Sequence, residues 1–343
     1  MWQRQYDKYE DAYLQIFENA LSQNPESNVE FLEKNVKKVA QREYAVACNS
    51  ATDALMFSLV ANDIGPGDEV LVTNFSWIST ASCIAMAGAT PVFCDIDFDT
   101  RHISIDSIKR MQSPKVKAII YTHLFGSMSD TTEIEQWCKE SNVLFIEDAA
   151  QSIGSSYNGK VAGSIGDCSS YSFNANKVIS GISGGGMFMT DSKEMAEKVK
   201  KLRKHGKDDR DGYITLGVNS KMYVLNAMMI DFRLKQLESE RERRKEIAMI
   251  YDSILDQTHE QPGLIHNYHK YTYLTDKRNL LDLQIHYDRP LSEHPMWQGI
   301  HHRADDTPNA REVSQKIVSL PIDAFMTDNE AKDVATKIYK TVE

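Results

Sequence analysis

The chain has 343 residues, a formal net charge of −10 at pH 7 and a hydrophobic share of 41%. This length and apolar content suffice for a large domain with a buried core and a smaller second domain. An acidic protein is a poor match for nucleic acid or a membrane surface, since both favour a basic face. We therefore expect neither of them as the main partner.

Five cysteines, an odd number, occur in mainly apolar stretches without the spacing of metal ligands. They indicate a reducing compartment and no disulfide framework. The N-terminal stretch "MWQRQYDKYEDAYLQ" is charged and lacks the apolar core of a secretory signal. We expect a cytoplasmic protein with no bound metal.

Apolar runs and helical periods alternate along the first half of the chain. A helical period over residues 5–40 is interrupted by the turn-like "SQNPESN" at 22–28. Nearly continuous apolar strands that alternate with helices are typical of a mostly parallel sheet covered on both faces, with functional groups at the carboxyl ends of the strands. The fold class is therefore predicted to be α/β. The expected strands are 44–48, 69–73, 90–96, 116–123, 143–149 and 168–173, and the expected helices between them include 51–63, 76–88 and 131–141.

The second half begins with a charged helical segment at 192–207 and a polar loop. A long helix is then expected from near Met222 to about Gln257. This helix is the predicted hinge between a large domain, residues 1–235, and a small C-terminal α+β domain, residues 236–343.

Polar groups follow several of the predicted strands. The motif "CNSATDAL" (48–55) ends a strand and opens a helix, so that free backbone N–H groups near Ser50, Ala51 and Thr52 suit a phosphate. An ordinary helix cap by Ser50 or Thr52 is the alternative. Trp77, at the start of the next helix, suits stacking on a planar ligand or a place in a core or interface.

Two ionisable residues also follow apolar runs. Asp148 ends "LFIED" and needs a cationic or hydrogen-bonded partner, and Gln151 follows three residues later. The alternative is a metal ligand or a helix cap, but no cluster of His and carboxylates completes a metal site. Lys177 lies five residues after Ser172 and precedes a glycine-rich turn, where a plain surface lysine is the alternative. The glycines do not have dinucleotide or P-loop spacing.

One chemistry explains these groups together. Pyridoxal phosphate requires a lysine amine for a Schiff base, a carboxylate for its ring nitrogen, an aromatic plane, and a helix N-terminus for its phosphate. The same lysine then serves as the base that moves the substrate Cα proton.

The motifs "NSATDAL", "THLFGSMSD", "FIEDAAQSIGSS", "SFNANK" and "GGGMFMTD" resemble the DegT/StrS-type sugar aminotransferases. That family is of the aspartate-aminotransferase-like fold type I and aminates nucleotide-linked keto sugars with pyridoxal phosphate. The resemblance runs from about residue 40 to 240 and returns at 286–295 and 317–323. It implies that Lys177 forms the Schiff base, Asp148 holds the ring nitrogen, Gln151 lies beside the ring hydroxyl, and Trp77 stacks on the ring.

The resemblance also implies a phosphate shell and a homodimer. Asn219, in "GVNSKM", would reach the phosphate of the neighbouring subunit, so the active sites would be shared. On the substrate side, Lys221 stands where the family usually has an arginine, and His286 and Tyr287 match a His–Tyr pair, although local packing remains the alternative. His123 faces the cleft or is structural. The phosphate shell would comprise Ser50, Ala51, Thr52, Asp53 and Ser172.

The function implied is transfer of an amino group from an amino acid, with glutamate expected, to a keto sugar on a nucleotide diphosphate. The "SFNxNK" form points to C4 of a 4-keto-6-deoxy sugar, for surface polysaccharide or glycan biosynthesis, with the cofactor alternating with pyridoxamine phosphate. The basic stretch "KVKKLRKHGK" (198–207), with Lys221, is the expected source of a positive field for the diphosphate, or else a solvated helix face.

Two alternatives use the same cofactor: a sugar dehydratase, although that branch has histidine where Lys177 stands, and a non-catalytic regulator. Three departures concern mainly the substrate side. They are Ala51 in place of a glycine, "SQNPESNVEF" in place of the usual substrate loop, and a short C-terminal domain.

Overall fold

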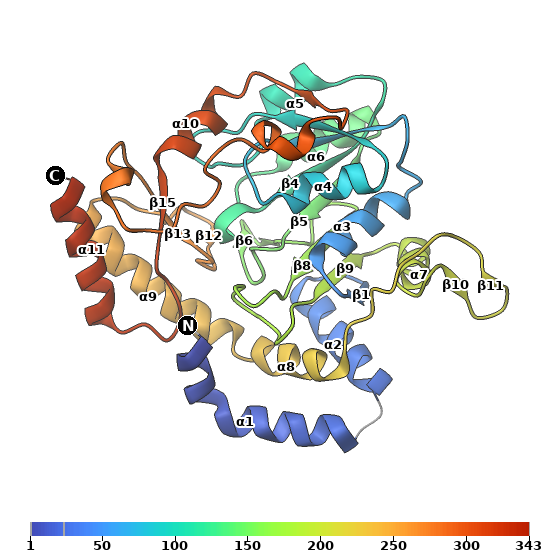
Figure 1. Cartoon of the computed structure of the whole chain (residues 1–343), viewed down its shortest axis with the longest axis horizontal. Helices are drawn as coiled ribbons and strands as arrows, with labels where there is room; N and C mark the ends of the chain where they lie inside the picture. The colour runs from blue at the N-terminus through green and yellow to red at the C-terminus, as the bar shows by residue number, and fades with distance from the viewer. Residues whose placement is uncertain (1, 23–24, 343) are drawn as a thin grey trace.

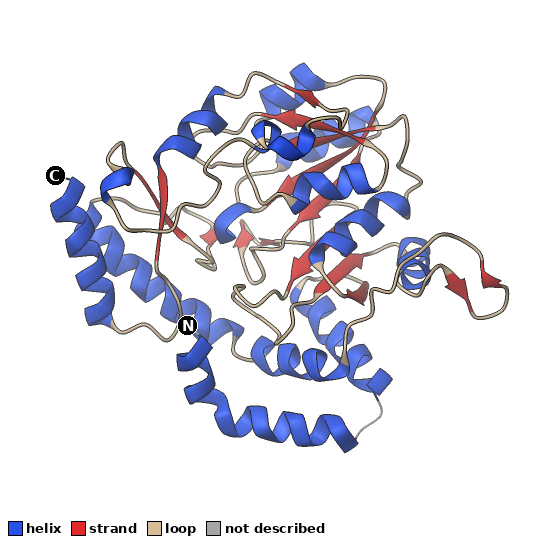
Figure 2. Cartoon of the chain, in the orientation of Figure 1, coloured by secondary structure: helices blue, strands red, loops and turns tan. Residues whose placement is uncertain are grey.

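A computed structural model describes residues 2–22 and 25–342 (Figure 1). Its centre is an eight-stranded sheet with helices on both faces (Figure 2). The order is β1-β9-β8-β5-β4-β2-β3-β14, and only β9 runs antiparallel to the rest, so the prediction of a mostly parallel sheet is confirmed. The strands are β1 (Tyr44–Cys48), β2 (Glu69–Thr73), β3 (Thr90–Cys94), β4 (Val116–Thr122), β5 (Leu144–Asp148), β8 (Cys168–Ser172), β9 (Gly186–Thr190) and β14 (Arg303–Ala304).

The two faces of the sheet have separate apolar cores, because successive strand residues point to opposite sides. Val70 and Val72 pack toward α3, α4 and α7, while Leu71 between them packs toward α5 and α6. Helices α2 and α8 cover the second face beside β1 and β9. The bounds are α2 (Pro25–Val39), α3 (Ala51–Val60), α4 (Ser79–Met86), α5 (Ile105–Met111), α6 (Thr132–Ser141), α7 (Lys193–Leu202) and α8 (Val224–Leu234).

The N-terminal helices lie against α8 at the bottom of Figure 1. Helix α1 (Trp2–Ser22) ends within the predicted turn, whose residues 23–24 lie outside the described part of the chain. Tyr9 anchors α1, since its ring meets Phe232 at 5.2 Å and its hydroxyl donates to Glu240 at 3.1 Å.

The long helix expected from Met222 to Gln257 is wrong, because the structure has two helices there: α8 and α9 (Leu237–Leu255). Leu234 and Leu237 pack into the core of the large sheet, whereas the later turns of α9 pack into a different core. A buried ion pair of 2.6 Å between Arg233 and Glu240 spans the turn. The demand of two separate cores overrides local helix propensity here.

The helix expected over 192–207 also ends earlier, at Leu202. The Leu202 carbonyl accepts from the N–H of Val218, a contact from a distant segment that replaces the next helical turn. A short hairpin follows, formed by β10 (Lys207–Asp208) and β11 (Gly212–Tyr213), at the right of Figure 1.

The C-terminal region has its own core, in which α9 packs against α11 and a two-stranded sheet. Residues 303–304 nevertheless pair with β3 in the large sheet. The domain boundary after residue 235 stays a prediction. The remaining elements are β6 (Ser156–Tyr157), β7 (Lys160–Val161), β12 (Leu264–Ile265), β13 (Tyr271–Leu274), β15 (Ile317–Leu320), α10 (Pro308–Lys316), α11 (Asp328–Val342) and the short helices η1 (Leu124–Gly126), η2 (Arg278–Leu280), η3 (Leu291–Glu293) and η4 (Pro295–Trp297).

Within residues 2–22 and 25–342, no helix combines the length and apolarity needed to cross a bilayer.

Candidate active site

A cavity of about 690 Å³ lies where β1, β5 and β8 end and α3 begins. Segments far apart in the sequence meet there, as expected for the carboxyl ends of parallel strands. Of the predicted site residues, those that line it are Ser50, Ala51, Thr52, Trp77, Asp148, Gln151, Ser172, Lys177, His286 and Tyr287. Asp53, Asn219 and Lys221 do not line it.

The start of α3 forms one end of the cavity. Ser50 caps the helix, since its Oγ accepts from the N–H of Asp53 at 3.1 Å and its carbonyl accepts from Ala54 at 3.2 Å. The N–H groups of Ala51 and Thr52, in the first turn, have no acceptor within the helix and remain available to an anion. The helix-cap and the phosphate readings of this motif are therefore compatible.

Close approach of β9 shapes this end of the cavity. A Cβ atom on Gly186 would lie 2.2 Å from the backbone carbon of Ser50, so only glycine allows the strand to pass there. Gly186 pairs with Cys48, which places it directly beside the loop that leads into α3.

Asp53 connects α3 to the segment that contains Asn219. Its carboxylate accepts from the Ser220 hydroxyl at 2.7 Å, and Ser220 Oγ in turn accepts from the N–H of Asn49 at 3.0 Å. Asn219 and Lys221 are exposed on either side of buried Ser220, as in an extended segment. Sequence reasoning missed Ser220, because all three residues of "NSK" are polar and only the structure shows that the middle one is buried.

Asp148 ends β5 with its carboxylate in the cavity wall. Thr80 Oγ1 donates to Oδ2 at 2.7 Å, and the N–H of Ala150 donates to Oδ1 at 3.2 Å. Thr80 comes one helical turn after Trp77, in the same motif, and was not predicted. Both bonds fix the orientation of the carboxylate, which still lines the cavity.

Lys177 lies in the loop between β8 and β9, where its backbone N–H donates to the Asn174 carbonyl at 2.9 Å. Burial of the ammonium lowers the pKa of Lys177 to about 8; Asp148 raises that pKa and Lys270 lowers it further. At pH 7 roughly one such lysine in ten is neutral, against about one in 2,500 at the ordinary value. The cavity therefore favours a reactive amine.

Gln151 and Tyr287 form a hydrogen-bonded pair opposite the lysine loop. The N–H of Phe125 donates to Gln151 Oε1 at 2.9 Å, which orients the amide so that Nε2 donates to Tyr287 Oη at 2.9 Å. The Tyr287 ring stacks on Phe125, with ring centroids 5.7 Å apart. His286 Nδ1 lies 2.7 Å from Ser319 Oγ. Burial lowers the pKa of His286 to about 4, and the charges of Lys270 and Lys177 contribute to the decrease.

His123 belongs to a network behind β5 rather than to the cavity. Its Nε2 lies 2.8 Å from Glu147 Oε2, and both side chains are fully buried. Of the two predictions for His123, the structural role is therefore the one that matches its position.

The basic stretch 198–207 is largely neutralised by nearby acids. Lys198 lies near Asp63 and Glu194, and Lys200, Lys201 and Arg203 each have a carboxylate within 2.8 Å. Lys204 and Lys207 are the members of this stretch outside these pairs. A solvated helix face describes most of the segment better than an anion site.

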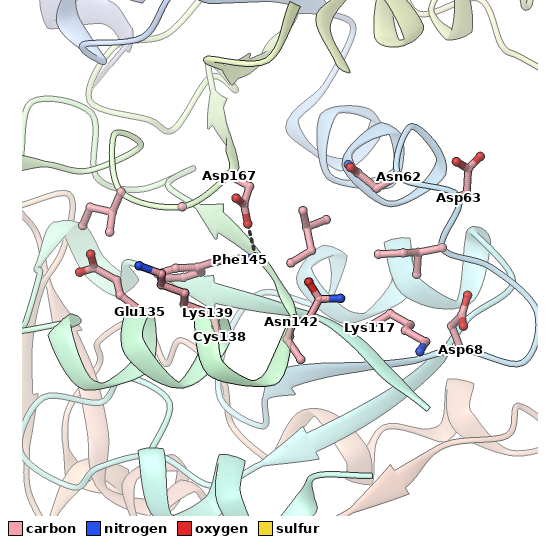
Figure 3. Close-up of a pocket in the computed structure, with 15 residues that line it drawn as sticks. Asn62, Asp63, Asp68, Lys117, Glu135, Cys138, Lys139, Asn142, Phe145 and Asp167 are labelled. Carbon is pink, nitrogen blue, oxygen red and sulfur yellow. Dashed lines mark hydrogen bonds between the residues drawn. The ribbon is translucent and has the colours of Figure 1, made fainter. Parts of the chain in front are cut away.

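A second cavity, of about 760 Å³, lies at the amino-terminal edge of the same sheet. Figure 3 shows Lys117, Asp68 and Asn142 around it, together with the bond from the Phe145 N–H to Asp167 at 2.8 Å. It contains none of the predicted site residues.

Sequence reasoning also missed His269 and Lys270, which line the first cavity. They come from the segment before β13. Asn267 in this segment donates its side-chain amide to the carbonyls of Gln151 and Ile153, both at 2.9 Å. A Cβ atom on Gly126 would lie 1.8 Å from Asn267 Oδ1, so this contact requires glycine.

Residues 7–339 match the sequence profile of the DegT/DnrJ/EryC1/StrS aminotransferase family. Similar proteins include a pleiotropic regulatory protein of Geobacillus stearothermophilus, 32% identical over 90% of this chain and 88% of its own length. Another is a UDP-N-acetyl-3-dehydro-alpha-D-glucosamine 3-aminotransferase of Acidithiobacillus ferrooxidans, 32% identical over 91% of this chain and 88% of its own.

Among solved structures, S. venezuelae DesV in complex with a ketimine intermediate superposes with a TM-score of 0.93 at 25% identity, covering 99% of this chain and 97% of that chain. The fold-type-I architecture predicted from the resemblance is confirmed. The chain belongs to the DegT/DnrJ/EryC1/StrS aminotransferase family.

Proposed function

We propose that this chain transfers an amino group from an amino acid to a keto sugar carried on a nucleotide diphosphate, using pyridoxal phosphate. The observation that carries the proposal is one cavity lined by Lys177 with a lowered pKa, by Asp148 and by the start of α3. An amine, a carboxylate and an anion site are the groups that this cofactor requires.

The residues present fit the cofactor. Ala51 and Thr52 offer backbone N–H groups and Ser172 a hydroxyl for the phosphate, and Asp148 offers a carboxylate for the ring nitrogen. Trp77, although 60% exposed, lines the cavity and presents a flat surface for the ring. The bound cofactor would supply an electron sink at the substrate carbon.

The protein's own groups would then perform the proton chemistry. Lys177 would hold the cofactor through its amine and, once released from it, would take the proton from the Cα of the donor and deliver it to the carbon on the cofactor side of the carbon–nitrogen bond. The Asp148 carboxyl, held by Thr80 and the Ala150 N–H, would accept a hydrogen bond from the ring nitrogen. The Phe125 N–H orients the Gln151 amide, which is hydrogen-bonded to the Tyr287 hydroxyl at the cavity wall.

For the sugar, we propose C4 of a 4-keto-6-deoxy sugar, supported by the "SFNxNK" form of the lysine loop. The relative from A. ferrooxidans is named for amination at C3, which makes C3 the competing position. Glutamate is the proposed donor. His286 and Tyr287, which line the cavity, are proposed to contact the sugar. Lys221, which is exposed outside the cavity, is proposed to contact the diphosphate.

A homodimer with shared sites is proposed on the surface around Asn219. Apolar side chains are exposed there, including Leu216 at 93%, next to the β10–β11 hairpin that projects from the body (Figure 1). An exposed apolar patch of this kind favours a protein partner. In a two-fold dimer each site would combine Lys177 of one chain with Asn219 of the other.

The shared-site proposal has a direct test. A Lys177→Ala chain mixed with an Asn219→Ala chain should regain activity, because the heterodimer has one site with both lesions and one intact site. Differential tags would verify subunit exchange, and exchange without recovery would contradict the proposal.

The alternatives remain secondary. A dehydratase of this fold would have histidine in place of Lys177. A regulator matches the name of the relative from G. stearothermophilus, but a regulator has no need of a lysine with a depressed pKa beside a carboxylate. Five free, buried thiols fit the proposed cytoplasmic location.

Borohydride reduction of the purified protein tests the cofactor assignment. Mass spectrometry should locate the reduced adduct on Lys177, and an adduct on another lysine would overturn the assignment. Incubation with glutamate and nucleotide-linked 3-keto and 4-keto sugars should then yield one amino sugar and 2-oxoglutarate. This incubation uses unreduced protein, because the reduced adduct cannot react further. Absence of amino transfer with every sugar, in a preparation whose borohydride-treated portion does show the adduct on Lys177, would favour the regulator.

A further inference from the structure

One cation in the active-site cavity has no ionic partner. Lys270 lines the cavity and, within residues 2–22 and 25–342, its ammonium forms no ion pair and no side-chain hydrogen bond. Burial lowers the pKa of Lys270, and Arg244 lowers it further; no carboxylate acts in the opposite direction. A half-buried ammonium without a counterion is costly, and an arriving anion would relieve that cost.

The position of Lys270 is set by backbone contacts rather than by its side chain. Its N–H donates to the Phe125 carbonyl at 3.1 Å, and Phe125 in turn orients Gln151. The Asn267 amide, three residues earlier, holds the same segment on Gln151 and Ile153. The ammonium is thus presented to the cavity from a rigid attachment.

The other ionisable groups in the cavity do not neutralise it. Lys270 lowers the pKa of Lys177, which shows that the two ammoniums share one field. Burial lowers the pKa of His269 and His286, so both imidazoles are neutral near pH 7. Asp148 acts on Lys177 and is already bonded to Thr80 and the Ala150 N–H.

The chemistry of amino transfer identifies the anion. The donor has its α-carboxylate on the very carbon that loses the amino group, so this carboxylate must lie beside the reacting atoms at Lys177. The sugar, in contrast, has its diphosphate on the anomeric carbon, several bonds from a keto group at C3 or C4. The phosphate of the cofactor has the start of α3.

We propose that Lys270 binds the α-carboxylate of the amino-acid donor and thereby sets donor affinity in the first half of the reaction. This inference rests on the proposed function and names a donor-binding residue for the same site. A charge-assisted hydrogen bond of this kind is the strong class of such contacts, and a guanidinium can replace the ammonium there.

The test separates the two halves of the reaction in the holoenzyme. Conversion of the cofactor by L-glutamate alone is followed by absorbance, and the return half by adding the keto-sugar nucleotide. Lys270→Gln should raise the glutamate concentration for half-maximal rate about 10- to 100-fold and leave the sugar half unchanged. Lys270→Arg should restore most of the affinity, and Lys332→Gln, an equal charge change on the exposed surface of α11, should have no effect.

A donor without the α-carboxylate sharpens the test. 4-Aminobutanoate should be a far weaker donor than glutamate for the wild type, and Lys270→Gln should lose much of that discrimination. Unchanged discrimination would overturn the proposal, as would a Lys270→Gln defect confined to the sugar half. If wild type reacts with no amino acid at all, the proposed function itself fails, which is a separate result.

The apoenzyme gives a readout without turnover. The pH dependence of amine modification at Lys177, followed by mass spectrometry, reports its pKa. Because Lys270 destabilises the Lys177 ammonium, Lys270→Gln should raise that pKa, whereas Lys332→Gln should not. An unchanged pKa would show that Lys270 does not face the reacting amine and would overturn the proposal.

Discussion

Glu147 and Asp148 are adjacent on β5, and their carboxylates point to opposite sides of the strand. Glu147 is fully buried and accepts from the N–H groups of Gly163, Ile165 and Gly166 at 2.6 to 2.8 Å, with His123 at 2.8 Å and Arg42 at 3.3 Å. Asp148 has two such bonds and faces the cavity.

The difference shows that burial alone does not mark a functional carboxylate. Every oxygen of Glu147 is satisfied from within the protein, so Glu147 can only hold segments together. The Asp148 carboxylate can accept a further hydrogen bond, and it lines the same cavity as Lys177. The number of bonds still available distinguishes the two residues, and the following substitutions test this distinction.

Lys177→Ala should have the largest effect, because it removes both the attachment of the cofactor and the base. We expect a loss of at least about 10³-fold in turnover, with the melting temperature within a few degrees of wild type. Amino-sugar formation and circular-dichroism melts would measure both. Lys332→Ala, at an exposed lysine of α11 outside the cavity, is the control, and more than a tenth of normal activity in Lys177→Ala would refute the assignment.

Asp148→Asn should come next, since a neutral amide no longer favours the protonated ring. We expect turnover to fall about 10²- to 10³-fold while thermal stability changes little. Steady-state rates, compared with the fraction of protein that carries cofactor, would check this. Normal turnover at full loading would show that Asp148 is only a structural residue.

Glu147→Gln should lower stability and leave turnover unchanged, the reverse of Asp148→Asn. Removing the charge breaks the buried ion pair with Arg42, which keeps Asp191 at 2.8 Å, and should cost about 1–3 kcal/mol of unfolding free energy, while the rate per folded molecule is kept. Urea unfolding and active-site titration would measure the two quantities. A stable but inactive Glu147→Gln protein would invert the comparison between the carboxylates.

Acid should expose the same network. Burial by itself would raise the pKa of Glu147, but His123, Arg42 and the Gly166 N–H outweigh it and lower the pKa below its usual value. A carboxyl with a depressed folded-state pKa stabilises the protein above its unfolded pKa of about 4.3, and this contribution is lost as the pH falls through the lower folded value. Wild type should therefore lose stability in that range more steeply than Glu147→Gln, as urea unfolding at several pH values would show.

Trp77→Ala should have the smallest effect. The side chain is 60% exposed, so stability should not change, and loss of stacking should weaken cofactor binding by about 0.5–1.5 kcal/mol, or two- to tenfold. Titration of the apoenzyme with pyridoxal phosphate, with Trp77→Phe as the conservative control, would measure this. Tighter binding in Trp77→Ala would contradict stacking.

Local pattern was sufficient for much of this protein. Apolar runs identified six of the eight strands of the large sheet, all but β9 and β14. Asp148 was located at a strand end because the apolar run of β5 closes on two carboxylates, Glu147 and Asp148, which is a local signal. The sequence also predicted a cap by Ser50 or Thr52, and the structure has Ser50, since capping involves only the next three residues. The grouping of Lys177, Asp148 and the start of α3 followed from one chemical requirement and from the geometry of parallel strands.

Contacts between distant segments decided the rest. No local signal shows that the helix must break between Leu234 and Leu237, because the break serves two cores formed by residues far away in the chain. His123 and Glu147 come within hydrogen-bonding distance only when the segments around them pack. The same packing leaves Lys270 in the cavity without a carboxylate partner. Hydrogen-bond partners and unpaired charge are properties of a three-dimensional neighbourhood, and sequence spacing does not contain them.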